Sequence, residues 1–164
     1  NQQRYLQVIE NKTAKLFEAA CRLAAIISDQ PNEIEQALAV YGNRLVSSFK
    51  IVDDVLDYNG EAATMGKNAG EDLAEGKPTL PLILAREKCN DKEREILDTA
   101  IRNGGADALN PVLNIIEKTG SIKSAMNIAR AHALEARQSI GILPESPWRV
   151  ALEQLADYSV DRDH

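Results

Sequence analysis

The sequence predicts an all-α protein, and three observations support this prediction. Apolar residues recur at steps of three and four positions through most of the 164 residues, which is the spacing of one face of an α-helix. Alternation of apolar and polar residues, the pattern of a half-buried strand, does not extend over a useful length. Glycine and proline stand in short groups between the periodic segments, where they would end helices. We therefore expect six or seven helices.

Two helices are expected before the first glycine-rich segment. The first starts at the beginning of the chain and ends near Pro31, because proline disfavours a helical conformation in the residue before it. The second runs from about Glu33 to Tyr58 and is stopped by Asn59-Gly60. Residues 60–77 are rich in glycine and have little apolar periodicity, so we predict mostly loop there. The apolar positions of the first helix are Leu6, Ile9, Leu16, Phe17, Ala20 and Ala24.

The remaining helices are expected to be shorter. The first of them is entered through a proline, which is favourable in the first turn of a helix. Gly104-Gly105, Gly120 and the segment 144–147 separate the later ones. A chain of this length can form one domain with its own core. The predicted helices cover residues 79–88, 91–102, 107–118, 121–140 and 148–160.

The composition excludes some classes of function. A net charge of −6 argues against a nucleic-acid-binding surface, which needs a basic stripe. No apolar run approaches the roughly 18 residues that a membrane span needs, so we expect no transmembrane segment. Cys21 and Cys89 lack the spacing of a metal or redox motif, and we interpret them as unpaired thiols.

Three aspartates near the end of the second predicted helix are the strongest functional signal. On a helix that turns by about 100° per residue, Lys50, Asp53, Asp54 and Asp57 fall within an arc of about 100°, opposite an apolar side. A solvated polar face is the ordinary explanation of such an arc. However, like charges one turn apart repel each other, and aspartate is a poor helix former. A bound cation would compensate for both costs, and oxygen ligands suit Mg²⁺, which also bridges to phosphate.

Lysines stand on either side of these aspartates in the sequence. Lys67 and Lys77 each follow a glycine, but the glycine spacing is not that of a P-loop and neither lysine precedes Ser or Thr. Lys12 and Thr13 interrupt the apolar side of the first helix. Each lysine alone is explained as an exposed side chain. Together with the aspartates, they indicate a polyphosphate ligand bridged by Mg²⁺.

These segments resemble the trans-isoprenyl diphosphate synthases. The stretches DDVLDY (53–58), GKNAGEDL (66–73) and EGKPTLP (75–81) are similar to the second aspartate-rich motif of that family and the loop that follows it. The stretch KTA (12–14) is similar to its upstream lysine–threonine motif. The stretch PESPWR (144–149) resembles the bacterial octaprenyl type in particular. The resemblance covers essentially the whole chain.

The resemblance implies an isoprenoid-synthase-type helical bundle of which residues 1–164 are the C-terminal part. The implied reaction is Mg²⁺-dependent, head-to-tail transfer of the prenyl group of an allylic diphosphate onto isopentenyl diphosphate, with loss of pyrophosphate. Metal binding is implied for Asp53, Asp54 and Asp57. Diphosphate binding is implied for Lys12, Lys67 and Lys77, and the catalytic positions are those of Lys12, Thr13 and Lys50.

Two departures from the family pattern qualify this assignment. The first aspartate-rich motif of the family is absent, which leads us to expect that the N-terminal half is missing and that the isolated chain has little activity. Lys50 stands where the family usually has Gln, and Val46 where it usually has Gly. A cation at residue 50 would compete with Mg²⁺ and oppose an allylic cation, so we hypothesise that Lys50 weakens catalysis.

The leading interpretation is therefore an octaprenyl-type synthase that makes the side-chain precursor of a respiratory quinone. The resemblance implies a cytoplasmic homodimer for the intact protein. One alternative is a non-catalytic subunit of the same fold. A shorter-chain farnesyl or geranylgeranyl synthase is another, since the residues that set product length lie upstream of the first motif.

Overall fold

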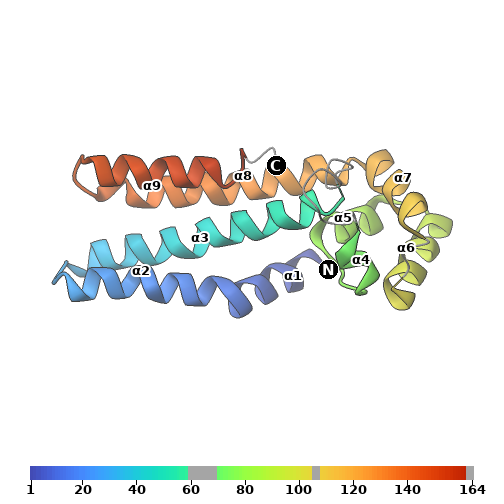
Figure 1. Cartoon of the computed structure of the whole chain (residues 1–164), viewed down its shortest axis with the longest axis horizontal. Coiled ribbons are helices and arrows are strands. Elements are labelled where there is room, and N and C mark those ends of the chain that lie inside the picture. Colours follow the sequence, from blue (N-terminus) through green and yellow to red (C-terminus); the bar gives the residue numbers. More distant parts are fainter. Residues whose placement is uncertain (59–69, 105–107, 162–164) are drawn as a thin grey trace. The chain divides into compact units, whose positions relative to one another are not determined.

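The computed structural model of the chain describes residues 1–58, 70–104 and 108–161 (Figure 1). Helices account for 84% of these described residues, which contain no strand, and this confirms the all-α prediction. Among the described residues, no helix has both the length and the apolar character to cross a bilayer. Cys21 and Cys89 are both free thiols, as predicted.

A π-helical segment divides the predicted first helix. Helix α1 (Gln2–Ile9) leads into the π-helical segment η1 (Glu10–Ala14), and α2 (Lys15–Ile27) follows it. Helix α3 (Asn32–Leu56) ends two residues earlier than the sequence predicted. The periodicity of the first helix did not reveal the interruption, because a single π turn shifts the helical phase without ending the helix.

The shorter helices largely match the prediction. The exception is α4, a four-residue helix that lies inside the segment predicted as mostly loop. Helix α6 begins with a capping box in which the Asn90 side chain accepts from the backbone N–H of Glu93, and the Glu93 side chain accepts from that of Asn90. The remaining elements are α4 (Glu71–Ala74), α5 (Leu80–Lys88), α6 (Asp91–Asn103), α7 (Leu109–Thr119), α8 (Ser121–Ser139), the 3-10 segment η4 (Ile140–Ile142) and α9 (Pro147–Tyr158).

The chain forms two compact units, each with its own core. Among the described residues, unit 1 comprises those within Asn1–Tyr5 and Ile51–Asn127, so it contains the end of α3 and helices α4 to α7. Apolar side chains from α4, α5, α6 and α7 are fully buried in it, and Tyr58 packs among them. The core therefore anchors the residues that come directly after the aspartates of α3. Its fully buried members include Leu73, Leu82, Leu97 and Val112.

Unit 2 comprises Leu6–Lys50 and Ile128–Asp163. Its core contains Tyr41 of α3, Ala136 of α8 and Ala156 of α9. The two small alanines allow the helices to approach closely. The hydroxyl of Tyr41 donates to the carbonyl oxygen of Leu152 at 2.9 Å. Burial raises the pKa of Tyr41 to about 12, so its hydroxyl remains a donor at neutral pH.

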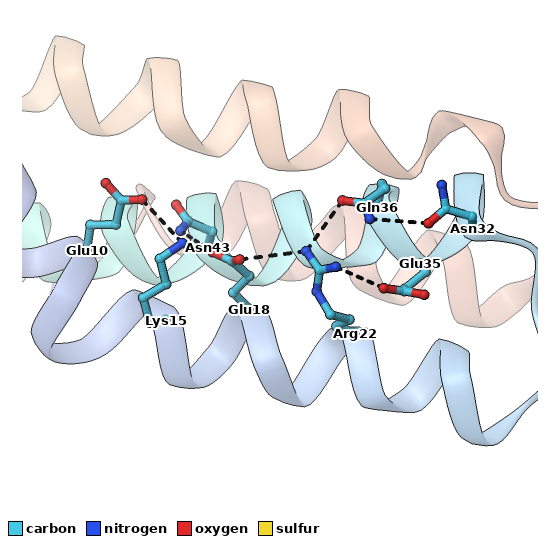
Figure 2. Close-up of polar contacts among 8 residues, drawn as sticks. All are labelled: Glu10, Lys15, Glu18, Arg22, Asn32, Glu35, Gln36 and Asn43. Carbon is cyan, nitrogen blue, oxygen red and sulfur yellow. Dashed lines mark hydrogen bonds and ion pairs between the residues drawn. The ribbon is translucent and has the colours of Figure 1, made fainter.

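Charged and amide side chains join α2 to α3 within unit 2 (Figure 2). The Glu18 carboxylate accepts from the Lys15 ammonium at 3.0 Å and from the Asn43 amide at 2.9 Å. The Arg22 guanidinium donates to Glu35 on α3 at 2.8 Å. Helix α2 therefore turns its polar side toward α3.

The apolar side of α2 faces away from α3 and lies at the surface of the unit. The exposed fractions are 72% for Leu16, 52% for Leu23 and 80% for Ile27. These positions are seven and four residues apart, which is about two turns and one turn, so they form one stripe along the helix. The apolar residues that recur along α2 thus lie on an exposed side of this helix.

Glu18 is expected to make stability depend on acidic pH. Its bonds with Lys15 and Asn43 lower the pKa of this carboxyl in the folded protein. A lowered folded pKa contributes stability above the unfolded pKa, and that contribution is lost as pH falls through the folded value. We therefore expect Glu18→Gln to be less stable than the native chain near neutral pH by about 1 kcal/mol, and the difference to shrink toward about pH 3.5. Urea unfolding at both pH values measures this.

Glu10→Gln is the matched control for this prediction. Glu10 also pairs with Lys15, but at 3.6 Å and with 48% of its side chain exposed. Exposed ion pairs contribute little to stability. A difference between Glu18→Gln and the native chain that stayed constant with pH would contradict the role assigned to Glu18.

Candidate functional site

The three predicted aspartates lie at the end of α3, within unit 1. Asp54 is buried, with 8% of its surface exposed, while Asp53 and Asp57 are half-buried. Asp57 comes one residue after the helix ends at Leu56. The surroundings of α3 differ from the two-sided helix that the sequence suggested, because Ile51, beside the acidic arc, is fully buried. The acids thus lie against protein and not on an open polar face.

Asp54 is bonded to a tyrosine from the start of the chain. The hydroxyl of Tyr5, on α1, donates to Oδ2 of Asp54 at 2.5 Å. Burial is the largest cause that raises the pKa of Tyr5, followed by the charge of Asp54 and the bond to it. The charges of Asp72 and Asp53 raise this pKa further, which indicates that both carboxylates lie near the hydroxyl. The phenol therefore stays protonated and can donate to Asp54 over the whole physiological range.

Asp57 connects the end of α3 to α4. Its Oδ1 and Oδ2 accept from the backbone N–H groups of Glu71 at 3.1 Å and Asp72 at 3.2 Å. Its carbonyl oxygen accepts from the N–H of Gly70 at 2.9 Å. Gly70 has a φ of 82°, in the left-handed region that glycine adopts without strain. Burial raises the pKa of Asp57, and the two amide bonds oppose that shift. One aspartate thus holds both ends of the segment 58–70 together.

Lys77 is paired with Asp72, the residue whose backbone N–H donates to Asp57. Its ammonium lies 3.2 Å from Oδ1 of Asp72 and also contacts Glu75, and these bonds raise the pKa of Lys77. The backbone N–H of Lys77 donates to the carbonyl oxygen of Asp72 at 2.8 Å, so α4 and the following turn fix its position. Asp57 and Lys77 are therefore linked through Asp72.

A second tyrosine organises the segment that follows Lys77. The hydroxyl of Thr79, the residue before α5, donates to the hydroxyl oxygen of Tyr58 at 3.1 Å, and both residues are buried. Burial raises the pKa of Tyr58 above its usual range. This contact joins the residue after Asp57 to the turn that contains Lys77.

The other predicted site residues belong to different parts of the chain. Lys12 and Thr13 lie in the π-helical segment η1 of unit 2, Lys12 exposed and Thr13 half-buried. π-helical turns are rare and frequently occur at functional sites. Lys50, half-buried on α3, is the last residue of the first stretch of unit 2. Lys67 lies outside the described residues. The structure thus links Lys77 to Asp57 through Asp72, and the functional roles of all the predicted site residues stay predictions.

The donor set at the end of α3 fits a divalent cation bound by few protein ligands. Within the ranges that the structure describes, no three His, Cys, Asp or Glu side chains are grouped so that they could hold a metal ion. Asp54 and Asp57 accept hydrogen bonds from protein donors, although a carboxylate has about four acceptor sites and retains some capacity. Mg²⁺ needs only one or two carboxylates when phosphate and water supply its other ligands. A closed site made by three aspartates is therefore not the arrangement that we expect.

Two residues of this cluster, Tyr5 and Asp72, were not predicted from the sequence. Tyr5 is separated from Asp54 by 49 positions, and no spacing pattern links them. Asp72 lies inside the stretch GKNAGEDL that supports the family resemblance, and this was the available signal. Its proximity to Lys77 depends on the short helix α4, which the sequence did not predict.

The fold and site together define a helical protein whose acidic helix end is suited to a divalent cation with a phosphorylated ligand. The chain belongs to the polyprenyl synthetase family, whose model matches residues 1–117. It is 45% identical over 161 residues to the octaprenyl diphosphate synthase of Haemophilus influenzae, covering 98% of this chain and 49% of that protein. It is 40% identical over 163 residues to the octaprenyl diphosphate synthase of Escherichia coli, covering 99% of this chain and 50% of that protein.

Solved structures give the same result. A polyprenyl synthase from Caulobacter crescentus, complexed with calcium and isoprenyl diphosphate, matches with a TM-score of 0.91 and 37% identity, covering 100% of this chain and 51% of that one. A decaprenyl diphosphate synthase from Rhodobacter capsulatus matches with the same TM-score, identity and coverage. The chain thus spans about half the length of the relatives that it matches, and the matched part of the octaprenyl synthases is their C-terminal half.

Proposed function

We propose that this chain provides the second aspartate-rich motif of a trans-polyprenyl diphosphate synthase. The observation that carries the proposal is the linked group at the end of α3, in which Asp57 holds α4 and Asp72 holds Lys77. Family membership supports it, and the relatives include two octaprenyl diphosphate synthases and a decaprenyl diphosphate synthase. We propose a product in this long-chain range, with a shorter-chain synthase as the alternative enzyme.

The proposed reaction breaks the allylic carbon–oxygen bond, and pyrophosphate leaves with the bonding electron pair. The double bond of isopentenyl diphosphate attacks the allylic carbon, a carbon–carbon bond forms, and a proton is lost. A divalent cation, when bound, would neutralise charge on the departing diphosphate, and we propose Mg²⁺ for this role. The bound calcium named for the Caulobacter relative supports a site for a divalent ion in that protein.

The residues of this chain would bind and orient the leaving group. Asp53 and Asp54 would supply carboxylate ligands from α3. The Lys77 ammonium, exposed and held by Asp72, could exchange one acidic partner for a phosphate oxygen. By resemblance, we assign Lys12 and Lys67 to the same diphosphate. Thr13 would lie near the developing allylic cation.

The isolated 164 residues test the binding part of this proposal. We expect Mg²⁺ and pyrophosphate together to raise the melting temperature, and each alone to raise it much less, because a ligand that binds only the folded state stabilises it. A purely structural helical scaffold would show no such synergy. We further propose that turnover requires the remainder of the enzyme, so the isolated chain mixed with isopentenyl and farnesyl diphosphates should elongate them slowly or not at all.

A substitution at Lys50 tests whether the chain belongs to an active enzyme or to a non-catalytic subunit of the same fold. Lys50 precedes Asp53 by three residues and Asp54 by four on α3, positions at which charges on a helix interact. We expect Lys50→Gln to tighten Mg²⁺ binding roughly twofold at low salt and to raise the turnover of the intact enzyme. Lys118→Gln, which removes an exposed lysine paired with Glu93, is the control. If the Mg²⁺ affinity and the turnover are the same with Lys or Gln at residue 50, the inhibitory role proposed for Lys50 is contradicted.

In keeping with the family resemblance, we propose that the intact protein is a cytoplasmic homodimer that supplies a quinone side-chain precursor. Mass measurement of the intact enzyme in solution tests the dimer.

A further inference from the structure

Tyr5 contributes a half-buried phenol to the acidic end of α3. Its hydroxyl donates to Oδ2 of Asp54 at 2.5 Å, within the range of charge-assisted O–H···O⁻ bonds. Such bonds are about twice as strong as bonds between neutral groups. The two residues are 49 positions apart, so the contact fixes α1 to α3 inside unit 1.

The position of the hydroxyl sets it apart from the other tyrosines described above. It lies near the carboxylates of Asp53 and Asp54 on α3 and of Asp72 on α4, whose charges all act on it. The hydroxyl of Tyr58 accepts a bond from Thr79, and that of Tyr41 donates to a backbone carbonyl. Of these three, Tyr5 is the one whose hydroxyl donates to a predicted metal ligand.

A hydrogen bond to one carboxylate oxygen of an aspartate helps to hold the other oxygen in a constant direction. The terminal torsion of an aspartate is broad, so an untethered carboxylate samples many orientations. Bonding Oδ2 to the hydroxyl of a half-buried tyrosine restricts this torsion and thereby limits where Oδ1 points. Buried carboxylates also require hydrogen bonds to offset the loss of water, and Asp54 is 8% exposed.

We propose that Tyr5 is a positioning residue, which orients the carboxylate of Asp54 for divalent-cation binding and does not itself touch cation or diphosphate. The inference rests on the proposed function and adds a residue outside both motifs that the sequence shares with the family. Groups that orient metal ligands in this way typically change metal affinity by about 10- to 100-fold when they are removed.

The test is Tyr5→Phe, which removes one hydroxyl oxygen and keeps the ring. Mn²⁺ is titrated into the 164-residue chain with pyrophosphate present, and bound Mn²⁺ is followed by electron paramagnetic resonance. We expect the Mn²⁺ dissociation constant to increase by about 10-fold. Circular dichroism melts without metal show that the variant is folded. Tyr41→Phe is the matched control, since it removes a buried hydroxyl that bonds to Leu152 in unit 2, and its Mn²⁺ affinity should equal that of the native chain.

The outcomes separate this inference from the proposed function. Native-chain binding of Mn²⁺ with an unchanged dissociation constant in Tyr5→Phe overturns the positioning role alone, even if the melting temperature falls. No binding by the native chain overturns the proposed function and, with it, the role of Tyr5. A double-mutant cycle with Asp54→Asn gives a second test. If Tyr5 acts through Asp54, Tyr5→Phe has no further effect on Mn²⁺ affinity in the Asp54→Asn chain, and an undiminished effect contradicts the proposal.

Discussion

Replacing Asp53 with asparagine is expected to weaken Mg²⁺-dependent pyrophosphate binding by more than about 100-fold, which exceeds the usual effect of a residue that only orients a ligand. Asparagine keeps the size of the side chain but removes the negative charge that a hard cation requires. We propose Asp53 as a ligand of the ion, so removing its charge should remove most of the Mg²⁺-dependent affinity. Calorimetric titration of pyrophosphate at fixed Mg²⁺ measures the effect.

Asp57→Asn is the companion variant. We expect it to reduce the stability of the fold and to affect pyrophosphate binding less than Asp53→Asn does. Each carboxylate oxygen of Asp57 accepts from one backbone N–H of α4. An asparagine side chain has only one oxygen, so the variant would keep one of these two bonds and lose the other. The loss of one charged acceptor should cost about 1.5–3 kcal/mol of unfolding free energy, while the effect on pyrophosphate affinity should be smaller than that of Asp53→Asn. Equal losses of affinity in the two variants would show that Asp57 is a metal ligand of the same rank.

Gly42→Ala is expected to destabilise unit 2 by up to about 2 kcal/mol, the difference between an overpacking cost of about 1–3 kcal/mol and a gain of about 1 kcal/mol from the better helix propensity of alanine. A Cβ at residue 42 would lie 2.5 Å from the carbonyl oxygen of Phe17 and 2.7 Å from Sγ of Cys21. The first of these atoms is backbone, so α2 would have to move away from α3. That movement would also lengthen the bond between Asn43 and Glu18, which is 2.9 Å (Figure 2). Urea unfolding measures the loss.

Gly141→Ala provides the control for the close approach of α2 and α3. A Cβ at residue 141 would meet no atom within 4 Å. The substitution should leave the unfolding free energy unchanged or slightly increased, because alanine restricts the unfolded chain. A Gly42→Ala variant as stable as Gly141→Ala would mean that the two helices separate at no cost.

Much of the fold could be predicted because helix boundaries depend on local chemistry. Gly104 and Gly120 follow the ends of α6 and α7 with positive φ, the conformation that glycine favours after a helix. Two features could not be predicted in this way. The π turn Glu10–Ala14 preserves helical periodicity on both sides, and the polar side of α2 faces α3 because of partners such as Asn43 that are distant in sequence.

The candidate site was predictable to the extent that it depends on spacing along one helix. The positions of Asp53, Asp54 and Asp57 follow from helical geometry. Their individual surroundings do not, because each is determined by a different tertiary contact. Tyr5 comes from another helix, and the amides that Asp57 binds belong to α4. The three aspartates look equivalent in the sequence, but in the structure they have different neighbours.

The stripe of Leu16, Leu23 and Ile27 on α2 has a practical consequence at the bench. Contiguous aliphatic surface of this kind adheres to other apolar surfaces, and more strongly as sulfate or phosphate salts are added. Preparations of these 164 residues should bind to phenyl-substituted chromatography resin, enhance the fluorescence of naphthalene dyes while fully folded, and keep best in dilute, low-salt buffer. Dye binding by this protein would then report its native surface and not a molten state.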